Sequence, residues 1–263
     1  MEKKVTIKDI AKAANVSTAT VSYIINNRED QTISEETKNK VWQIINLFNY
    51  KPSIMAKNLR SLPDIKSIAI ICEYTNDLFK LECIDFLNLL SNSFLDNNFN
   101  LIYASSNTYS PNADAIVAFN VSKESFYKIG KGTFIPLIAL DTLINDPLFF
   151  QVSTDYDKLI KKARSYFKDE FQLVMIRPNS EELINEISSI FSNVVFISTF
   201  EELSNINSTN ILCVDNVIKN YFSKKNRNVF LDESLFSTKI DKIIICIQNA
   251  LRREKFDVHF YKV

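Results

Sequence analysis

Two short amphipathic segments joined by a turn of three residues constrain the N-terminal fold more than any other feature. In "TIKDIAKAANVSTATVSYII", residues 6–25, apolar residues recur at helical spacing on both sides of that turn. Thr6, with an aspartate three residues later, is typical of a helix start and predicts a helix over 7–14. Asn15 readily adopts the left-handed conformation that ends a helix, and Ser17 is a good cap for the next helix. This spacing predicts a helix-turn-helix.

The second of these helices has a polar outer face. Its core-facing residues are expected to be Val16, Val21 and Ile24 or Ile25. The side chains left on the outside are those of Ser17, Thr18, Ala19, Ser22, Tyr23 and Asn26. Because such short side chains approach base edges and phosphate oxygens closely, this face is typical of a surface that reads DNA. The alternative is a solvated helix with no partner.

A third amphipathic helix, "ISEETKNKVWQIINLF", follows at the distance that a three-helix head requires, and Ser34 caps it. Its inward-facing residues are expected to be Val41, Ile44, Ile45 and Phe48. The next stretch, "KPSIMAKNLRS", places Pro52 at a helix start before an apolar stripe, which predicts a short linker helix. The expected domains are a helix-turn-helix head over 1–51, a hinge helix and linker over 52–62 and a body over 63–263.

The formal net charge of zero conceals an asymmetry between the head and the body. Residues 1–62 hold 10 Lys/Arg against 6 Asp/Glu, whereas residues 63–263 hold 21 against 25. The N-terminal region is therefore +4 and the remainder is −4. A basic head on an acidic body favours nucleic-acid binding by the head, and ordinary surface variation is the alternative.

The body alternates short β-rich apolar runs with longer mixed runs, which predicts an α/β fold with largely parallel sheets. In such sheets, ligands bind beyond the carboxyl ends of the strands. We therefore expect an effector site formed by polar and aromatic residues near these ends. Its candidate residues are Tyr74, Asn76, Phe79, Asp141, Asp155, Arg177, Asp215, Asn216 and Asp232.

Several other classes of protein are disfavoured. The longest apolar runs, such as "KIIICIQ", are far shorter than a bilayer crossing, and the start "MEKKVTIKD" has no signal-peptide core, so we expect a cytoplasmic protein. The cysteines are far apart in the sequence with no CxxC pair, which favours buried free thiols over disulfides or a zinc site. They are Cys72, Cys83, Cys213 and Cys246.

Catalytic motifs are also missing from the sequence. It has no GxGxxG, GxxxxGK[ST], GxSxG or HExxH motif, and its single histidine, His259, is expected to be a strand residue rather than a general base. The aspartates at strand ends could form a carboxylate pair, but helix caps and turns explain most of them. We expect no enzymatic activity, no metal and no cofactor.

The runs "VTIKDIAKAANVSTATVSYIINN" and "ISEETKNKVWQIINLFNYKPSIMAKNLRS", residues 5–61, closely resemble the DNA-binding head of the lactose/galactose-repressor (LacI/GalR) family of bacterial transcription regulators. The resemblance implies that Thr18, Ala19 and Tyr23 read bases in the major groove. It also implies that Leu59, on the hinge helix, enters the minor groove and kinks the duplex. The remaining contacts expected with DNA, chiefly with its phosphates, are those of Thr6, Ser17, Ser22, Asn26, Ser34, Tyr50, Ala56, Lys57 and Arg60.

Two positions in the head depart from the family pattern. Asn15 replaces the usual turn glycine, and Tyr23 lies where many members have an arginine. Because a tyrosine cannot form the bidentate contact that arginine makes with guanine, the resemblance implies an operator different from the common one.

The body resembles a shortened and divergent form of the two-lobed effector domain of that family, which is similar to periplasmic sugar-binding proteins. The similar segments include "NADAIVAFN", "IPLIALDT", "VSTDYDKLIKKA", "ILCVDN" and "FSTKID". After "FQLVMIR", however, "PNSEELINE" lacks the arginine that grips sugar hydroxyls in the family. The whole chain has only two glycines, Gly130 and Gly132, so close backbone approaches to a ligand are few.

Taken together, the residues and the resemblance predict an all-α helix-turn-helix head with a hinge helix, followed by an α/β two-lobed body like that of periplasmic binding proteins. The expected function is that of a homodimeric transcription repressor, associated with the nucleoid and bound to a pseudo-palindromic operator. The helices "LFKLECIDFLNLL" and "DKIIICIQNAL" are candidates for the dimer interface. A sugar or sugar derivative is the expected effector. One alternative is a DNA-binding regulator whose body binds no small molecule and responds to a partner protein. A third possible function is that of an enzyme.

Overall fold

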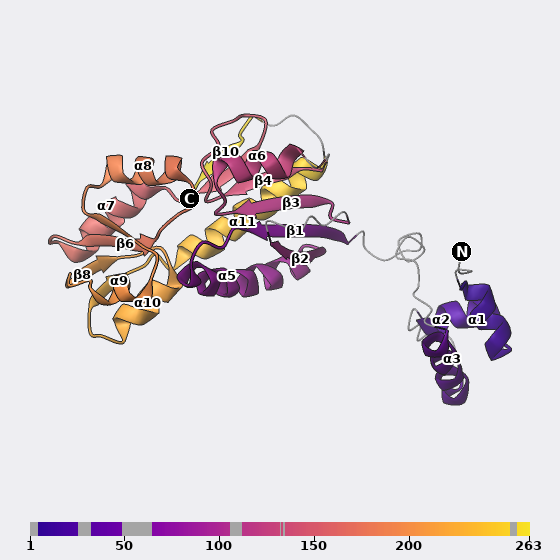
Figure 1. Ribbon diagram of the computed structural model, residues 1–263. Coiled ribbons are helices and arrows are strands. Elements are labelled where there is room, and N and C mark those ends of the chain that lie inside the picture. Colours follow the sequence, from indigo (N-terminus) through magenta and orange to yellow (C-terminus); the bar gives the residue numbers. More distant parts are fainter. Residues whose placement is uncertain are drawn as a thin grey trace. The chain divides into compact units, whose positions relative to one another are not determined.

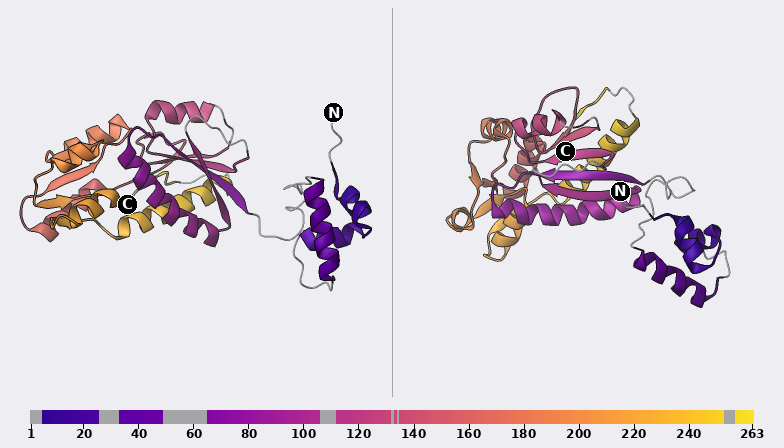
Figure 2. Two further views of the ribbon diagram at one scale, coloured as in Figure 1. Left: turned by 60° about the horizontal axis from the view of Figure 1, so that its bottom comes forward. Right: turned by 45° about the vertical axis from the view of Figure 1, so that its right-hand side comes forward.

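The computed structural model of the chain divides into two compact units, Met1–Asp64 and Ile65–Val263 (Figures 1 and 2). The structure describes residues 5–25, 33–48, 65–105, 112–131, 133, 135–252 and 257–263. Within these ranges, no helix combines the length and the apolar character needed to cross a bilayer.

In its described residues, 5–25 and 33–48, the first unit, the head, has three helices. They are α1 (Ile7–Ala14), α2 (Thr18–Ile25) and α3 (Glu35–Leu47). Asn15 ends α1 with φ 57° and ψ 45°, which is the left-handed conformation expected of it. Ser17 and Ser34 precede α2 and α3, and each serine hydroxyl accepts a hydrogen bond from a backbone N–H of the first turn, at 3.0 and 3.3 Å. The predicted helix-turn-helix and both predicted serine caps are therefore confirmed.

The head has its own small apolar core. The buried residues are Ile10, Ala11, Ala14, Val21, Ile24, Val41 and Ile45. Phe48 was expected to face inward, and this prediction is wrong because Phe48 is 37% exposed. It lies one residue beyond the end of α3, where the described head covers only part of its side chain.

The described residues of the second unit, the body, form two sheets. The six-stranded sheet has the order β10-β5-β4-β3-β1-β2, and the four-stranded sheet has the order β7-β6-β8-β9. The strands of the first are β1 (Lys66–Cys72), β2 (Phe99–Ser105), β3 (Ala115–Phe119), β4 (Leu137–Leu140), β5 (Phe150–Ser153) and β10 (Phe260–Lys262). Those of the second are β6 (Gln172–Ile176), β7 (Val194–Ile197), β8 (Asn210–Leu212) and β9 (Asn228–Phe230). Neighbouring strands pair in parallel in both sheets, which confirms the predicted α/β fold with two lobes.

Helices cover both faces of each sheet (Figure 1). On the six-stranded sheet, α5 (Asp77–Asp96) and α11 (Ser234–Arg252) pack on one face and α6 (Lys123–Lys131) on the other. On the four-stranded sheet, α7 (Tyr156–Phe167) and α8 (Glu181–Ile190) lie opposite α9 (Phe200–Ser204) and α10 (Asn216–Ser223). Because both faces are covered, the inner strands β1, β3 and β4 are nearly continuous buried apolar runs rather than alternating ones.

One apolar core extends through both lobes. It joins Phe86 and Phe94 of α5 and Ile243 of α11 to Ile218 and Phe222 of α10. The four cysteines are buried and free, as expected. Two of them nevertheless meet in space, because Cys72 ends β1 and Cys83 lies on α5, with 3.0 Å between their sulfur atoms.

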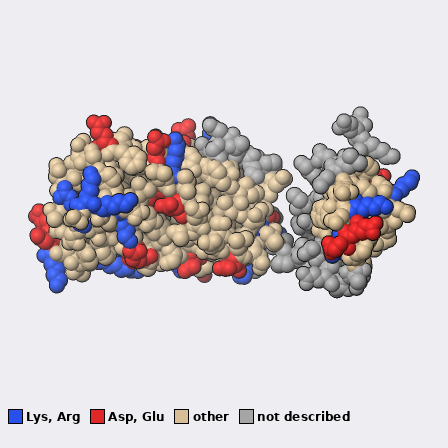
Figure 3. Space-filling model, turned by 90° about the horizontal axis from the view of Figure 1, so that it is seen from below, with Lys and Arg blue, Asp and Glu red and all other residues tan. Residues whose placement is uncertain are grey.

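Charged side chains of the body are dispersed on the face seen in Figure 3. Lys and Arg side chains are most frequent toward the left-hand end of this face, and Asp and Glu are scattered over the rest of a mostly uncharged surface.

Candidate functional site

The outer face of α2 is the first candidate site. Ser17, Thr18 and Ala19 are exposed, while Ser22 and Tyr23 are half-buried. The first turn of α2 carries no acidic residue, so its backbone N–H groups and the positive end of its dipole favour a phosphate. This face has the position, size and polarity expected of a surface that contacts DNA.

Three residues expected to contact DNA, Ser17, Thr6 and Ser34, already have partners within the head. The Ser17 hydroxyl accepts from the Thr20 N–H and also bonds the Thr20 hydroxyl at 2.8 Å. Thr6 donates from its hydroxyl to Asp9 Oδ2 at 2.6 Å. Ser34 caps α3. The other expected contacts, Asn26, Tyr50, Ala56, Lys57, Leu59 and Arg60, lie outside the described residues.

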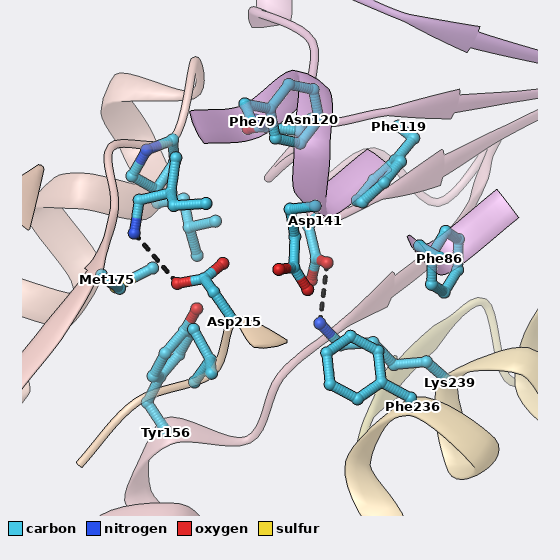
Figure 4. A pocket seen from close by; sticks show the side chains of 15 residues that line it. Phe79, Phe86, Phe119, Asn120, Asp141, Tyr156, Met175, Asp215, Phe236 and Lys239 are labelled. Carbon is cyan, nitrogen blue, oxygen red and sulfur yellow. Dashed lines mark hydrogen bonds and ion pairs between the residues drawn. The ribbon is translucent and has the colours of Figure 1, made fainter. Parts of the chain in front are cut away.

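The second candidate site is a cleft between the two lobes of the body (Figure 4). Aromatic side chains from both lobes form much of its wall, namely those of Phe79, Phe86, Phe119, Tyr156 and Phe236. Its polar residues are Glu82, Asn120, Asp141, Asp215 and Lys239. The cavity volume is about 50 Å³, which is room for very few water molecules.

A buried ion pair occupies the cleft. Lys239 Nζ on α11 donates to Asp141 Oδ2 at 2.7 Å, and the two side chains are only 7% and 18% exposed. Asp141 follows β4 with φ 46°, and Asn120 follows β3 with φ 48°. Asp and Asn tolerate this left-handed backbone better than most residues, which explains their presence at these two neighbouring strand ends.

Two further carboxylates of the cleft bind backbone N–H groups. Glu82 Oε2 accepts from Val217 at the start of α10 at 3.0 Å, and Asp215 Oδ2 accepts from Ile176 at 2.9 Å. Burial raises the pKa of Glu82 to about 6. Burial and then the charge of Glu82 raise the pKa of Asp215 well above its usual range.

The cleft also contains unused acceptors. Within the described part of the chain, Glu82 Oε1 and Asp141 Oδ1 are buried and have no hydrogen-bond partner. A buried acceptor without a partner is costly, so these atoms favour a proton or a ligand donor group beside them.

Asn179, which follows β6, links the lobes. Its backbone N–H donates to Asn120 Oδ1 at 2.9 Å, and its Nδ2 donates to the Glu73 and Asn120 carbonyls at 2.6 and 2.7 Å. Its Oδ1 accepts from the Thr75 hydroxyl at 2.7 Å. All four bonds join the four-stranded lobe to the strand ends of the six-stranded lobe.

The structure brings together three of the nine candidate effector residues, Phe79, Asp141 and Asp215. Tyr74 and Asn76 instead line a separate groove beside Phe200, and Asn76 caps α5 at 2.8 Å. The others lie outside the cleft wall: Asp155 caps α7, Arg177 pairs with Glu181 on the surface, Asn216 begins α10, and Asp232 pairs with Lys162. An effector role for these nine residues stays a prediction.

Sequence reasoning missed the two charged residues at the centre of the cleft, Glu82 and Lys239. A signal was present, because each lies at helical spacing among apolar residues. Glu82 comes three residues after Phe79 and four before Phe86, and Lys239 comes three after Phe236. A charge on an otherwise apolar helix face indicates a buried partner.

The chain joins a helix-turn-helix head to a two-lobed body of parallel sheets, and known proteins resemble both parts. Residues 6–53 match the model of the bacterial regulatory proteins of the lacI family. The HTH-type transcriptional repressor PurR of Escherichia coli O139:H28 is 42% identical over 80 residues, which are 30% of this chain and 23% of that protein. The match thus spans about a quarter of the length of these curated relatives.

Solved structures resemble the chain over nearly its whole length. The Lac repressor bound to ONPG in the repressed state covers 99% of this chain and 97% of that one, with a TM-score of 0.55 and 12% identity. A LacI-family transcriptional regulator from Silicibacter pomeroyi covers 98% and 96%, with a TM-score of 0.52 and 13% identity. The head thus resembles that of the lacI family in sequence, and the body shares the fold of these solved regulators.

Proposed function

We propose that the chain is a sequence-specific DNA-binding transcriptional repressor that binds a pseudo-palindromic operator as a homodimer. The observation that carries the proposal is the exposed polar face of α2, on a helix-turn-helix that matches the lacI family model. The curated relatives that match are named as transcriptional repressors, and an enzymatic activity is not proposed. The proposal implies a cytoplasmic protein associated with the nucleoid.

The proposed DNA contacts divide into two kinds. Thr18, Ala19 and Tyr23 read base edges in the major groove, while Thr6, Ser17 and Ser22 position the head on phosphates. Leu59 unstacks a central base step, so that the deformability of the operator adds to its recognition.

Selection of bound sequences from a random duplex pool by the full-length protein tests the proposal. We expect a palindrome with a sharply preferred central step. Leu59→Ala should lose that central preference, whereas Leu62→Ala, a matched change in the same linker, should retain it. Tyr23→Ala should change the bases selected in the half-sites. Failure to enrich any sequence at moderate salt would contradict the proposal.

The exposed face of α5 supports a dimer formed through the body. Leu81, Ile84 and Leu95 lie along this face and are 44%, 54% and 68% exposed. The other candidate helix, α11, buries Ile240, Ile243 and Ile247 in the core instead. Sedimentation velocity tests the assignment: Ile84→Glu should give a monomer, whereas Leu148→Glu, at a residue 83% exposed in a loop, should remain a dimer. A dimeric Ile84→Glu variant would overturn it.

A second candidate is a repressor whose body takes no sugar effector. The cleft favours it, because ligand pockets usually measure about 300–1,000 Å³, whereas this cleft measures about 50 Å³. The buried Lys239–Asp141 pair also occupies the polar part of the cleft.

Thermal unfolding of the protein with a panel of sugars, nucleosides and sugar phosphates separates the two candidates. An effector at a hundred times its dissociation constant should raise the free energy of unfolding by about 2.7 kcal/mol. A panel with no such increase would support the second candidate.

A further inference from the structure

Cys72 and Cys83 form a close pair of thiols beside the cleft. Cys72 is the last residue of β1, Cys83 lies in the second turn of α5, and both are almost fully buried. Their sulfur atoms are 3.0 Å apart. Because a disulfide bond is about 2.05 Å long, a relative movement of about 1 Å would bring the sulfurs to bonding distance.

The two thiols differ chemically. The hydrogen bond between the two sulfur atoms lowers the pKa of Cys83 and raises the pKa of Cys72. The Tyr74 hydroxyl donates to Cys83 Sγ at 3.5 Å and further favours the thiolate there. Since the thiolate is the reactive form of cysteine, Cys83 is the nucleophile of the pair and Cys72 the resolving thiol.

Tyr74 also connects the pair to solvent. The same residue lines a groove of about 380 Å³ together with Asn76, Lys80 and Phe200. The phenol therefore lies between this groove and Cys83.

We propose that Cys72 and Cys83 form a reversible intramolecular disulfide on oxidation by a small hydroperoxide. The Cys83 thiolate attacks one peroxide oxygen, the O–O bond breaks, and a sulfenic acid forms on Cys83. Cys72 sulfur then attacks Cys83 sulfur, the S–S bond forms, and the hydroxyl leaves with the Cys72 proton as water. Overall, two thiols and one molecule of hydrogen peroxide give one disulfide and two molecules of water.

The position of the pair links this oxidation to the contacts between the lobes. The segment between the two cysteines contains Glu73 and Thr75, which bind Asn179, and Phe79 and Glu82, which line the cleft. Drawing β1 and α5 together at Cys72 and Cys83 moves both sets of contacts. Intracellular disulfides are usually transient and redox-sensing, in agreement with such a role.

The experiment treats the full-length protein with hydrogen peroxide, then denatures it and alkylates the remaining thiols for mass spectrometry. We expect the number of alkylated thiols to fall from four to two, a Cys72–Cys83 linked peptide to appear, and dithiothreitol to restore all four. Cys213→Ala and Cys246→Ala are matched buried controls and should still lose two thiols. Cys72→Ala should instead accumulate oxygen on Cys83 with no intramolecular disulfide.

Four thiols that all remain alkylated in the wild-type protein, or a linked peptide that contains Cys213 or Cys246, would overturn the proposal. The wild-type result alone decides this, even where a variant fails to fold. Operator binding by the reduced and oxidised protein is a separate readout that rests on the proposed function. If neither the reduced nor the oxidised protein binds an operator, the proposed DNA-binding function is contradicted. The number of alkylated thiols still tests the disulfide independently.

Discussion

Replacing Glu82 by glutamine tests the electrostatics of the cleft. Burial raises the pKa of Glu82 from its ordinary value of 4.5 to about 6, with Asp85 adding to the shift and Lys239 and two backbone N–H groups opposing it. One pKa unit is worth about 1.4 kcal/mol, so the ionised carboxylate costs the folded state about 2 kcal/mol. Glutamine removes the charge and keeps an oxygen for the Val217 N–H.

The sign of the pH dependence follows from the raised pKa. A carboxyl group that binds its proton more tightly in the folded state stabilises the fold most below pH 4.5, and this stabilisation is lost as the pH rises through about 6. We therefore expect Glu82→Gln to match the wild type near pH 4 and to exceed its free energy of unfolding by about 2 kcal/mol at pH 7.5.

Urea unfolding followed by far-UV circular dichroism, from pH 4 to 7.5, measures this difference. Fluorescence of the single tryptophan would be misleading, because Trp42 lies in the head rather than the body. Glu170→Gln, at an exposed residue, is the control and should show no comparable rise with pH. A Glu82→Gln variant that is less stable than the wild type at pH 7.5 would refute the reasoning.

Three further changes test other parts of the structure. Asn179→Ala removes three side-chain hydrogen bonds between the lobes and should lower the free energy of unfolding by about 2–4 kcal/mol in urea titrations. The control Asn193→Ala loses bonds within one lobe and should lower it by less. Lys239→Met leaves Asp141 buried without its cation and should lower the free energy of unfolding by about 3–5 kcal/mol. Adding Asp141→Asn should recover much of this loss. If it does not, the loss comes from packing rather than from charge. Asn15→Val places a β-branched residue at φ 57° and should lower the thermal stability of the head by at least about 1 kcal/mol, whereas Asn15→Gly should be close to neutral.

The head was predictable almost to the residue because its signals are local. Asn15, Ser17 and Ser34 act on the turns that contain them, so their conformations follow from neighbouring residues alone. Phe48 was the exception, since its exposure depends on where α3 ends.

The fold class of the body could be predicted from the sequence, but the residues that form its cleft could not. Alternating apolar runs are enough to indicate parallel sheets, but they do not reveal which strand ends face each other. Glu82, Asn179 and Lys239 meet their partners only after the two lobes have packed. The contact between Cys72 and Cys83 likewise depends on the angle between β1 and α5, which the spacing of the two cysteines does not determine.

The core that extends through both lobes has a mechanical consequence. If the lobes swung apart about a hinge, the apolar contact between α5 and α10 would be exposed to water. Each 100 Å² of apolar surface exposed in this way costs about 2.5 kcal/mol, which lowers the population of an open form about 70-fold. The body should therefore transmit a signal by small displacements of a nearly rigid block rather than by wide opening and closing.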